Sequence, residues 1–167
     1  MTSGSDAAAG RRPARLDEYS GDIIAFDLES GRVYKALMEI TIRLTSAEAD
    51  GRLAAGEQLP RPWPRPHQAL IDTGSQHTHV KKDIVDHLGL DPVSDVKVPS
   101  RRPDGGVTFG LLYRVRISFG GGPGRDVKVV AGAAPGVPHD VLIGTTLLTH
   151  CTLSWNGPEG TFTISML

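Results

Sequence analysis

The sequence predicts a mostly β chain with one or two short helices, on three observations. Several stretches alternate apolar and polar residues with the period of two that turns one face of a strand toward a core. Turns rich in glycine separate these stretches, and residues 80–89 place apolar side chains at helical spacing. The chain has 167 residues, about one domain, and its 39% hydrophobic content suffices for one compact core.

The first 20 residues differ in composition from the rest of the chain. Residues 1–20 are rich in Ala, Gly, Ser and Arg and carry almost no large apolar side chain. Such a segment cannot bury enough surface to offset the entropy lost on ordering. We therefore predict a disordered leader at 1–20 and a folded domain at 21–167.

The first long strand is predicted from Val33, where alternation places Ile40 and Ile42 on the same face. Residues 45–67 then lose this periodicity and end in a run of alternating prolines. Proline favours an extended conformation that cannot donate to a strand ladder. We therefore expect a surface connector over 45–67.

A helix and a hairpin are predicted in the middle of the chain. Residues 80–89 carry four apolar side chains at helical spacing, with Gly89 as a natural stop. Alternation at 96–98 and again at 107–109 flanks a glycine-containing turn at 101–106. This pattern is typical of a β-hairpin.

The last third of the chain predicts two further antiparallel strand pairs, because alternating stretches are joined by glycine-rich turns. The strands of the first pair are expected at 113–119 and from 127 onward, and those of the second pair at 151–155 and 162–164.

The most informative local feature is a short apolar run, residues 69–71, that ends in Asp72, Thr73, Gly74 and Ser75. The apolar strand would deliver Asp72 to a buried edge, and Gly74 would let the backbone turn tightly beside it. The hydroxyls of Thr73 and Ser75 are expected to hydrogen-bond the carboxylate. The sequence thus predicts a positioned carboxylate.

Three elements in this order resemble the single-lobe, retropepsin-like branch of the aspartic proteases. They are the Asp-Thr-Gly-Ser run at 72–75, the helical pattern at 80–89, and the apolar run 140–144 that ends in glycine and is followed by Leu147 and Leu148. The resemblance covers roughly residues 33–167. It implies an all-β fold, a closed acid-protease-type β-barrel lobe, with residues 140–144 packed beside the catalytic loop.

The resemblance also implies the site. Asp72 would perform the proton chemistry, with Thr73 and Gly74 completing the catalytic motif. The side chain of Gln76 would bind substrate backbone or tie the loop to itself, and both alternatives stay open. The hairpin at 101–108 lies where the family carries its mobile flap, although an ordinary surface hairpin would show the same glycines. The predicted substrate-binding residues are Ser75, Gln76, Gly105 and Gly106.

The number of carboxylates predicts the assembly. Aspartic hydrolysis uses two neighbouring carboxyl groups, one ionised and one protonated. The chain has no second Asp-Thr-Gly or Asp-Ser-Gly after an apolar strand. A twofold axis between two copies of Asp72 would supply the missing carboxylate. We therefore expect a homodimer that hydrolyses peptide or protein substrates. The family resemblance further implies that Thr73 would brace the partner's loop.

Charge and composition restrict the partners and the compartment. The formal net charge is -1 and the isoelectric point is near 6.6, so we expect no nucleic-acid partner. No stretch approaches the ~20 apolar residues of a membrane span, and the N-terminus lacks the apolar core of a secretory signal. A single cysteine, Cys151, forms no internal disulfide. The sequence predicts a cytoplasmic protein without membrane contact.

Two other functions fit part of the same sequence. A catalytically silent retropepsin-like module for binding or dimerisation would keep the fold without proteolysis. A small metal-binding β-protein would use His77, His79 and His87, because a His-x-His pair and a further histidine can ligate zinc. No carboxylate or cysteine completes a known ligand spacing. We therefore expect neither a metal nor another cofactor.

Overall fold

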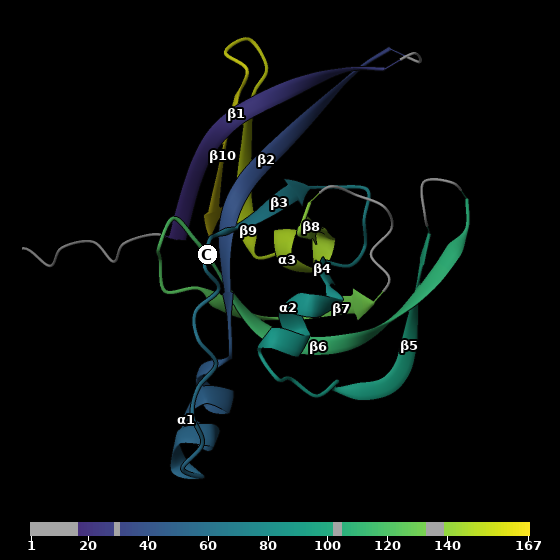
Figure 1. Ribbon diagram of the computed structural model, residues 1–167. Coiled ribbons are helices and arrows are strands. Elements are labelled where there is room, and N and C mark those ends of the chain that lie inside the picture. Colours follow the sequence, from purple (N-terminus) through teal and green to yellow (C-terminus); the bar gives the residue numbers. More distant parts are fainter. Residues whose placement is uncertain (1–16, 29–30, 102–104, 133–138) are drawn as a thin grey trace, which may run out of the picture.

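The computed structural model describes residues 17–28, 31–101, 105–132 and 139–167. These residues form ten strands and three short helices (Figure 1). The strands are β1 (Asp17–Leu28), β2 (Gly31–Arg43), β3 (His67–Ile71), β4 (His79–Lys81), β5 (Ser94–Arg101), β6 (Val107–Phe119), β7 (Arg125–Gly132), β8 (Val141–Ile143), β9 (Cys151–Asn156) and β10 (Thr161–Met166). The helices are α1 (Ser46–Ala54), α2 (Lys82–His87) and α3 (Thr145–Leu148).

Six of these strands close into a barrel. The order β6-β7-β4-β8-β3-β2 runs through hydrogen-bonded neighbours, and a further pairing of β2 with β6 completes the ring. The pairs β3–β8 and β4–β7 are parallel, whereas the other pairs of the ring are antiparallel. This arrangement confirms the predicted all-β fold with a closed barrel. One more helix is present than the sequence predicted.

Four strands extend the sheet beyond the barrel. β5 pairs with β6 as a hairpin, and β1, β10 and β9 continue outward from β2. In Figure 1 the β1–β2 hairpin and the β9–β10 hairpin project from the same end of the barrel, and α1 projects from the opposite end. β9 ends the sheet order, so it has one hydrogen-bonded neighbour, β10.

The core fills the barrel from several strands at once. Ile117 and Phe119 of β6 and Ile143 of β8 are completely buried. Ile84 of α2 and Leu147 of α3 pack into the same cluster. Burying one side chain of this size contributes ~2 kcal/mol, so the alternating apolar faces stabilise the closed ring.

Helix α1 corrects the prediction of an irregular connector over 45–67. It has no buried residue, so it lacks the apolar stripe by which a helix is recognised. Two local contacts stabilise it: Thr45 Oγ1 accepts a hydrogen bond from the Glu48 amide at 3.2 Å, and Arg52 Nε pairs with Glu48 at 3.0 Å. The Thr-x-x-Glu spacing of a capping box was present in the sequence as its signal.

The N-terminal boundary of the domain also needs a correction. Strand β1 begins at Asp17, inside the predicted leader 1–20, whereas residues 1–16 lie outside the described part of the chain. Asp17 is buried, and its carboxylate accepts hydrogen bonds from the amides of Phe119 and Gly124. The composition of residues 17–20 does not reveal this contact, because the two amides lie 102 and 107 residues further along the chain.

Strand β1 was not predicted, so the strand expected from Val33 is the second long strand rather than the first. The other strand predictions are confirmed in place, with two adjustments. β6 is one continuous strand that pairs with β5 at one end and with β7 and β2 at the other, where two separate stretches were expected. Val80 belongs to β4, so the predicted helix starts only at Lys82. Gly89 ends that helix as predicted, with a φ of 60° that glycine adopts without strain.

Candidate active site

Asp72 lies directly after β3, beside the end of the parallel neighbour β8. Register pairs Ile71 with Ile143, and the Asp72 amide donates to the Ile143 carbonyl at 2.9 Å. The Asp72 side chain is half-buried, and its Oδ1 accepts a hydrogen bond from the Gly74 amide at 2.9 Å. Its Oδ2 forms no hydrogen bond with any described residue. One carboxylate oxygen is therefore fixed and the other is available.

The carboxylate is held by a backbone amide rather than by hydroxyls, which corrects the expectation for Thr73 and Ser75. The chain turns so tightly that the Gly74 amide faces Asp72, two residues earlier. A Cβ at Gly74 would lie 3.2 Å from Asp72 Oδ1, so glycine leaves room for the carboxylate. Thr73 is exposed, and its hydroxyl has no partner among the described residues.

The loop after Asp72 is fastened to α3 through its carbonyl groups. The Ser75 carbonyl accepts the Thr145 amide at 2.8 Å, and the Gln76 carbonyl accepts the Thr146 amide at 3.1 Å and Thr145 Oγ1 at 3.0 Å. The Ser75 hydroxyl donates to the His77 carbonyl at 2.8 Å, so it braces the loop. The Gln76 side chain is exposed and forms no hydrogen bond within the described chain.

Gly144 permits this close contact between the two segments. A Cβ there would lie 2.2 Å from the His77 carbonyl oxygen and 2.8 Å from that of Ser75. Any other residue would push α3 away from the catalytic loop. The predicted packing of residues 140–144 beside that loop is therefore present, and glycine is needed for a steric reason.

Thr78 is a site residue that the sequence prediction missed. It is 0% exposed, and its Oγ1 accepts the Gly144 amide at 3.2 Å. Its own amide donates to Thr146 Oγ1 at 3.0 Å, and its carbonyl accepts the Val130 amide at 2.9 Å. A hydroxyl residue shortly after the Asp-Thr-Gly-Ser run was the only signal, and such a residue is equally common in ordinary turns.

His77 lies in the catalytic loop and His79 directly follows it, with ring centroids 6.4 Å apart. The pKa of His79 is lowered, by burial first and by His77 second, while Asp72 opposes the shift. His87 belongs elsewhere, because its ring packs on Trp63 with centroids 4.8 Å apart and binds the Arg61 carbonyl. Over the described ranges, no group of three or more His, Cys, Asp or Glu side chains is arranged for a metal ion.

The predicted flap hairpin is formed by β5 and β6. Register pairs Arg101 with Val107, while residues 102–104 lie outside the described residues. Gly105 adopts a φ of 84°, as the turn requires, and both Gly105 and Gly106 are exposed. Ser100 and Thr108, the register pair next to the one that closes the turn, line together with His79 a cavity of about 10 Å³, room for about one water molecule.

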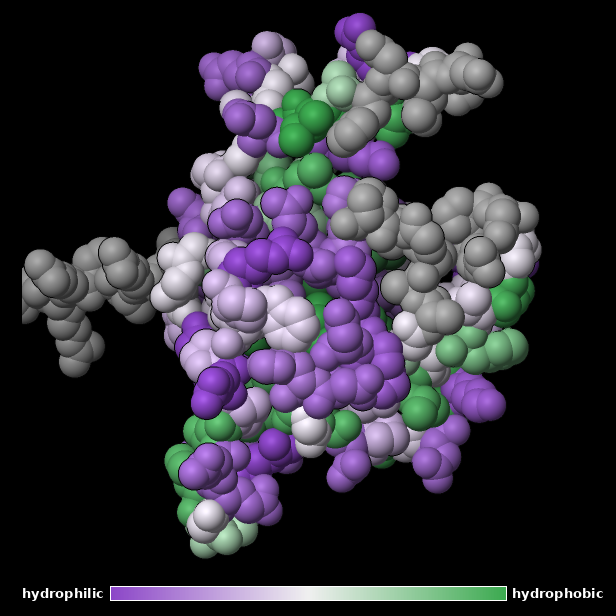
Figure 2. Space-filling view, in the orientation of Figure 1, coloured by the Kyte–Doolittle hydropathy of each residue, from purple (hydrophilic) through white to green (hydrophobic). Residues whose placement is uncertain are grey.

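The two strands of this hairpin carry exposed apolar side chains. Val107 is 54% exposed, Phe109 58% and Val96 67%. Figure 2 shows apolar surface on the side of the molecule where the hairpin lies. Side chains of this kind are expected where a segment meets a substrate or a partner.

Two other reactive groups are held in structural roles. The Cys151 thiol donates to the Leu147 carbonyl at 3.4 Å, and burial raises its pKa to about 11. It is thus a neutral thiol near neutral pH. Asp140 precedes β8 at the end opposite Asp72, and its carboxylate pairs with Lys81 at 2.9 Å.

No helix in the described residues is both long and apolar enough to cross a lipid bilayer.

Comparison with known proteins adds family evidence to this geometry. Residues 64–150 match the family described as "gag-polyprotein putative aspartyl protease". No curated protein matches the chain significantly. Among solved structures, a retropepsin-like aspartic protease from Rickettsia conorii superposes with a TM-score of 0.48 at 13% identity. That alignment covers 91% of this chain and 96% of the Rickettsia chain.

Proposed function

This chain belongs to the gag-polyprotein aspartyl protease family, and from that premise we propose that it is a homodimeric aspartic endopeptidase. The observation that carries the proposal is the state of Asp72. A rigid loop presents its carboxylate, with Oδ1 held by the Gly74 amide and Oδ2 without a partner among the described residues. The Oδ2 atom is thus available to a water molecule or to a second carboxyl group.

The chemistry requires two such carboxylates within hydrogen-bonding distance. One Asp72, ionised, takes a proton from a water molecule, and the other, protonated, polarises the scissile carbonyl. Two close carboxylates resist double ionisation and share one proton over a range of pH. We therefore expect a bell-shaped pH profile with its optimum on the acidic side.

A symmetric dimer supplies the second carboxylate, and proteases of the retropepsin type generally dimerise. The edge strand β9 supports this assembly, because it has one neighbour in the sheet and carries Thr152, Ser154 and Trp155 as exposed residues. An antiparallel edge can pair with its own copy across a twofold axis. The exposed Thr73 hydroxyl would then bind the partner's loop.

The substrate is proposed to be an extended peptide with apolar side chains. Gly74, Ser75 and Gln76 would line one side of it, and the hairpin glycines Gly105 and Gly106 would cover the other. Extended peptides bind through strand-like backbone hydrogen bonds, and the exposed Val107 and Phe109 favour apolar side chains. For the compartment we propose the cytoplasm, since the single cysteine is unpaired.

The test is incubation of the purified protein with a diverse peptide mixture, followed by mass spectrometry of new termini. Wild type is expected to cleave, and Asp72→Asn to lose about 10³-fold in rate with an unchanged fold. The matched control is Asp50→Asn, which removes an exposed carboxylate on α1 and is expected to keep full activity. Equal activity in Asp72→Asn would refute the mechanism, and a folded, dimeric, inactive wild type would favour the silent binding module.

A further inference from the structure

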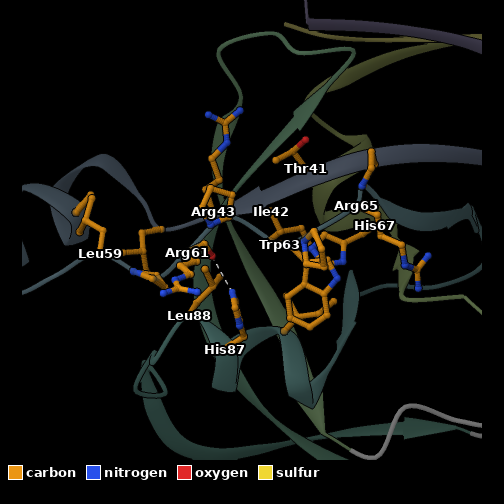
Figure 3. Close-up of a pocket in the computed structure, with 17 residues that line it drawn as sticks. Thr41, Ile42, Arg43, Leu59, Arg61, Trp63, Arg65, His67, His87 and Leu88 are labelled. Atoms are coloured by element: carbon orange, nitrogen blue, oxygen red, sulfur yellow. Dashed lines mark hydrogen bonds between the residues drawn. The ribbon is translucent and has the colours of Figure 1, made fainter.

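A cavity of about 530 Å³ lies between the end of β2, residues 59–66 of the connector and helix α2 (Figure 3). It is separate from the catalytic loop, because its lining reaches β3 only at His67, and Asp72 follows the other end of that strand. Five residues of strand span about 17 Å. Volumes of 300–1,000 Å³ are typical of small-molecule sites.

The cavity has an apolar floor. Ile42 and Leu44 of β2, together with Ile84 and Leu88 of the α2 region, line it and are buried. Trp63 forms one wall, with its ring centroid 5.1 Å from that of His67 and 4.8 Å from that of His87. An apolar group of a ligand would therefore leave water and contact aliphatic and aromatic side chains.

The ionisable residues around this floor are all basic. Arg43, Arg61, Arg65, His67 and His87 line the cavity, and no described Asp or Glu does. Arg43 donates to Ser118 at 3.2 Å, and Arg65 lies 3.8 Å from Asp140. The guanidinium of Arg61 has neither a hydrogen bond nor an ion pair within the described chain, and both Arg61 and Arg65 are exposed.

We propose that this cavity binds a small carboxylate with an aliphatic or aromatic body. The exposed guanidinium group of Arg61 would bind the carboxylate, and Arg65, on the other side of Trp63, would add positive charge (Figure 3). The buried floor beside Trp63 would accommodate the apolar body. An unpaired arginine beside an apolar pocket matches both ends of such a ligand, because arginine prefers carboxylates and is weakly hydrated. The proposal does not depend on proteolysis.

Trp63 provides the probe for the test. The chain has two tryptophans, so Trp155→Phe leaves Trp63 as the only one. In this background, octanoate is titrated while Trp63 fluorescence is followed, and calorimetry gives the stoichiometry. Octylammonium, with the same chain length and the opposite charge, is titrated in parallel.

Saturable binding of one octanoate per chain is expected, with octylammonium at least about tenfold weaker. Arg61→Gln is expected to weaken octanoate binding about threefold to fivefold, and Arg61→Gln with Arg65→Gln about tenfold. The control is Arg114→Gln, an exposed arginine on β6 outside the cavity, which should leave binding unchanged.

Three outcomes would overturn the proposal. Octanoate causes no saturable change, or octylammonium binds as tightly, or the double arginine variant binds octanoate as well as wild type does. Far-UV circular dichroism and the melting temperature of each variant identify any loss of binding caused by unfolding. If the double variant does unfold, the comparison of octanoate with octylammonium on the Trp155→Phe protein still decides.

Discussion

The catalytic loop 72–78 and the connector 45–66 flank the same strand, β3, yet they are held in different ways. The loop is fastened by backbone amides, carbonyls and three threonines within two short segments. The connector is fastened at separate points, by Arg52 on the carbonyls of Leu88 and Gly89 and by the Trp63 ring. A dense hydrogen-bond network fixes the positions of individual atoms, whereas a few separate contacts fix only the course of the backbone.

This difference follows from what each segment must do. A reacting carboxylate has to be placed to within a fraction of an ångström, and backbone hydrogen bonds achieve that with little conformational freedom. The connector forms one side of a cavity, which needs shape and charge but less precise geometry. Changes in the network should therefore affect turnover, and changes in the anchors should affect stability or ligand binding.

The largest effect after loss of Asp72 is expected at the flap hairpin. Replacing Gly105 and Gly106 with proline removes the positive φ of Gly105 and the freedom of the tip. We expect kcat/KM to fall about 10-fold to 100-fold with a nearly unchanged melting temperature, because both glycines are exposed. Steady-state kinetics beside wild type measures this. Unchanged turnover would identify the hairpin as an ordinary surface loop.

Thr78→Val is expected to loosen the catalytic network from inside. It leaves the Gly144 amide without its buried acceptor at nearly constant volume, which costs about 2–3 kcal/mol in the free energy of unfolding. Activity should fall as well, because α3 would no longer fix the loop. Denaturant unfolding and kinetics measure both. Thr78→Ser keeps the hydroxyl and should restore most of each, whereas equal losses in both variants would contradict the role of the hydroxyl.

Arg52→Met removes an anchor of the connector and keeps the aliphatic length of the side chain. Arg52 is 17% exposed and donates to two carbonyls at the end of α2, so we expect about 1–2 kcal/mol of destabilisation. Turnover at a permissive temperature should stay within about twofold of wild type, since the catalytic network is intact. A large loss of turnover in a folded variant would mean that the connector also positions the site.

The smallest effect is expected in the acid dependence of stability. Burial alone would raise the pKa of Asp140, but hydrogen bonds from Lys81 and the Gln68 amide, with the charges of Lys81 and Arg65, lower it below its ordinary 3.8. The folded state thus favours the ionised carboxylate, so its contribution is full above pH 3.8 and is lost as the pH falls through the folded-state pKa. Asp140→Asn should therefore weaken the dependence of stability on pH in this acid range.

Thermal melts between about pH 6 and pH 2 measure that difference between wild type and Asp140→Asn. The control is Asp91→Asn, which removes an exposed carboxylate that forms no hydrogen bond or ion pair with the described residues. It should leave the dependence of the melting temperature on pH as in wild type. If the melting temperature of Asp140→Asn depended on pH as steeply as that of wild type, Asp140 would not be the group responsible.

How well a region could be predicted depends on how far apart in sequence its contacting residues lie. The strands of the barrel and the position of Asp72 were predictable, because alternation and a glycine turn are local patterns. The role of Thr78 was not, since it depends on Gly144 and Thr146, which lie 66 and 68 residues away in sequence. Helix α1 was missed because it buries no side chain, although its cap at Thr45 was visible.

The N-terminal boundary of the domain was mispredicted for the same reason. Residues 17–20 look like the leader that precedes them, yet Asp17 is buried between two amides of the β6–β7 turn. A buried acceptor of two distant amides leaves no mark in local composition. The cavity behind Trp63 was equally hidden, because its lining comes from three segments whose proximity only the closed barrel creates.

If two copies of Asp72 form one active site, specific activity must depend on protein concentration. Specific activity on a cleaved peptide is recorded over a dilution series, with the monomer and dimer fractions determined in parallel by analytical ultracentrifugation. We expect specific activity to follow the dimer fraction and to vanish in the monomer. Full specific activity in a verified monomer would contradict it.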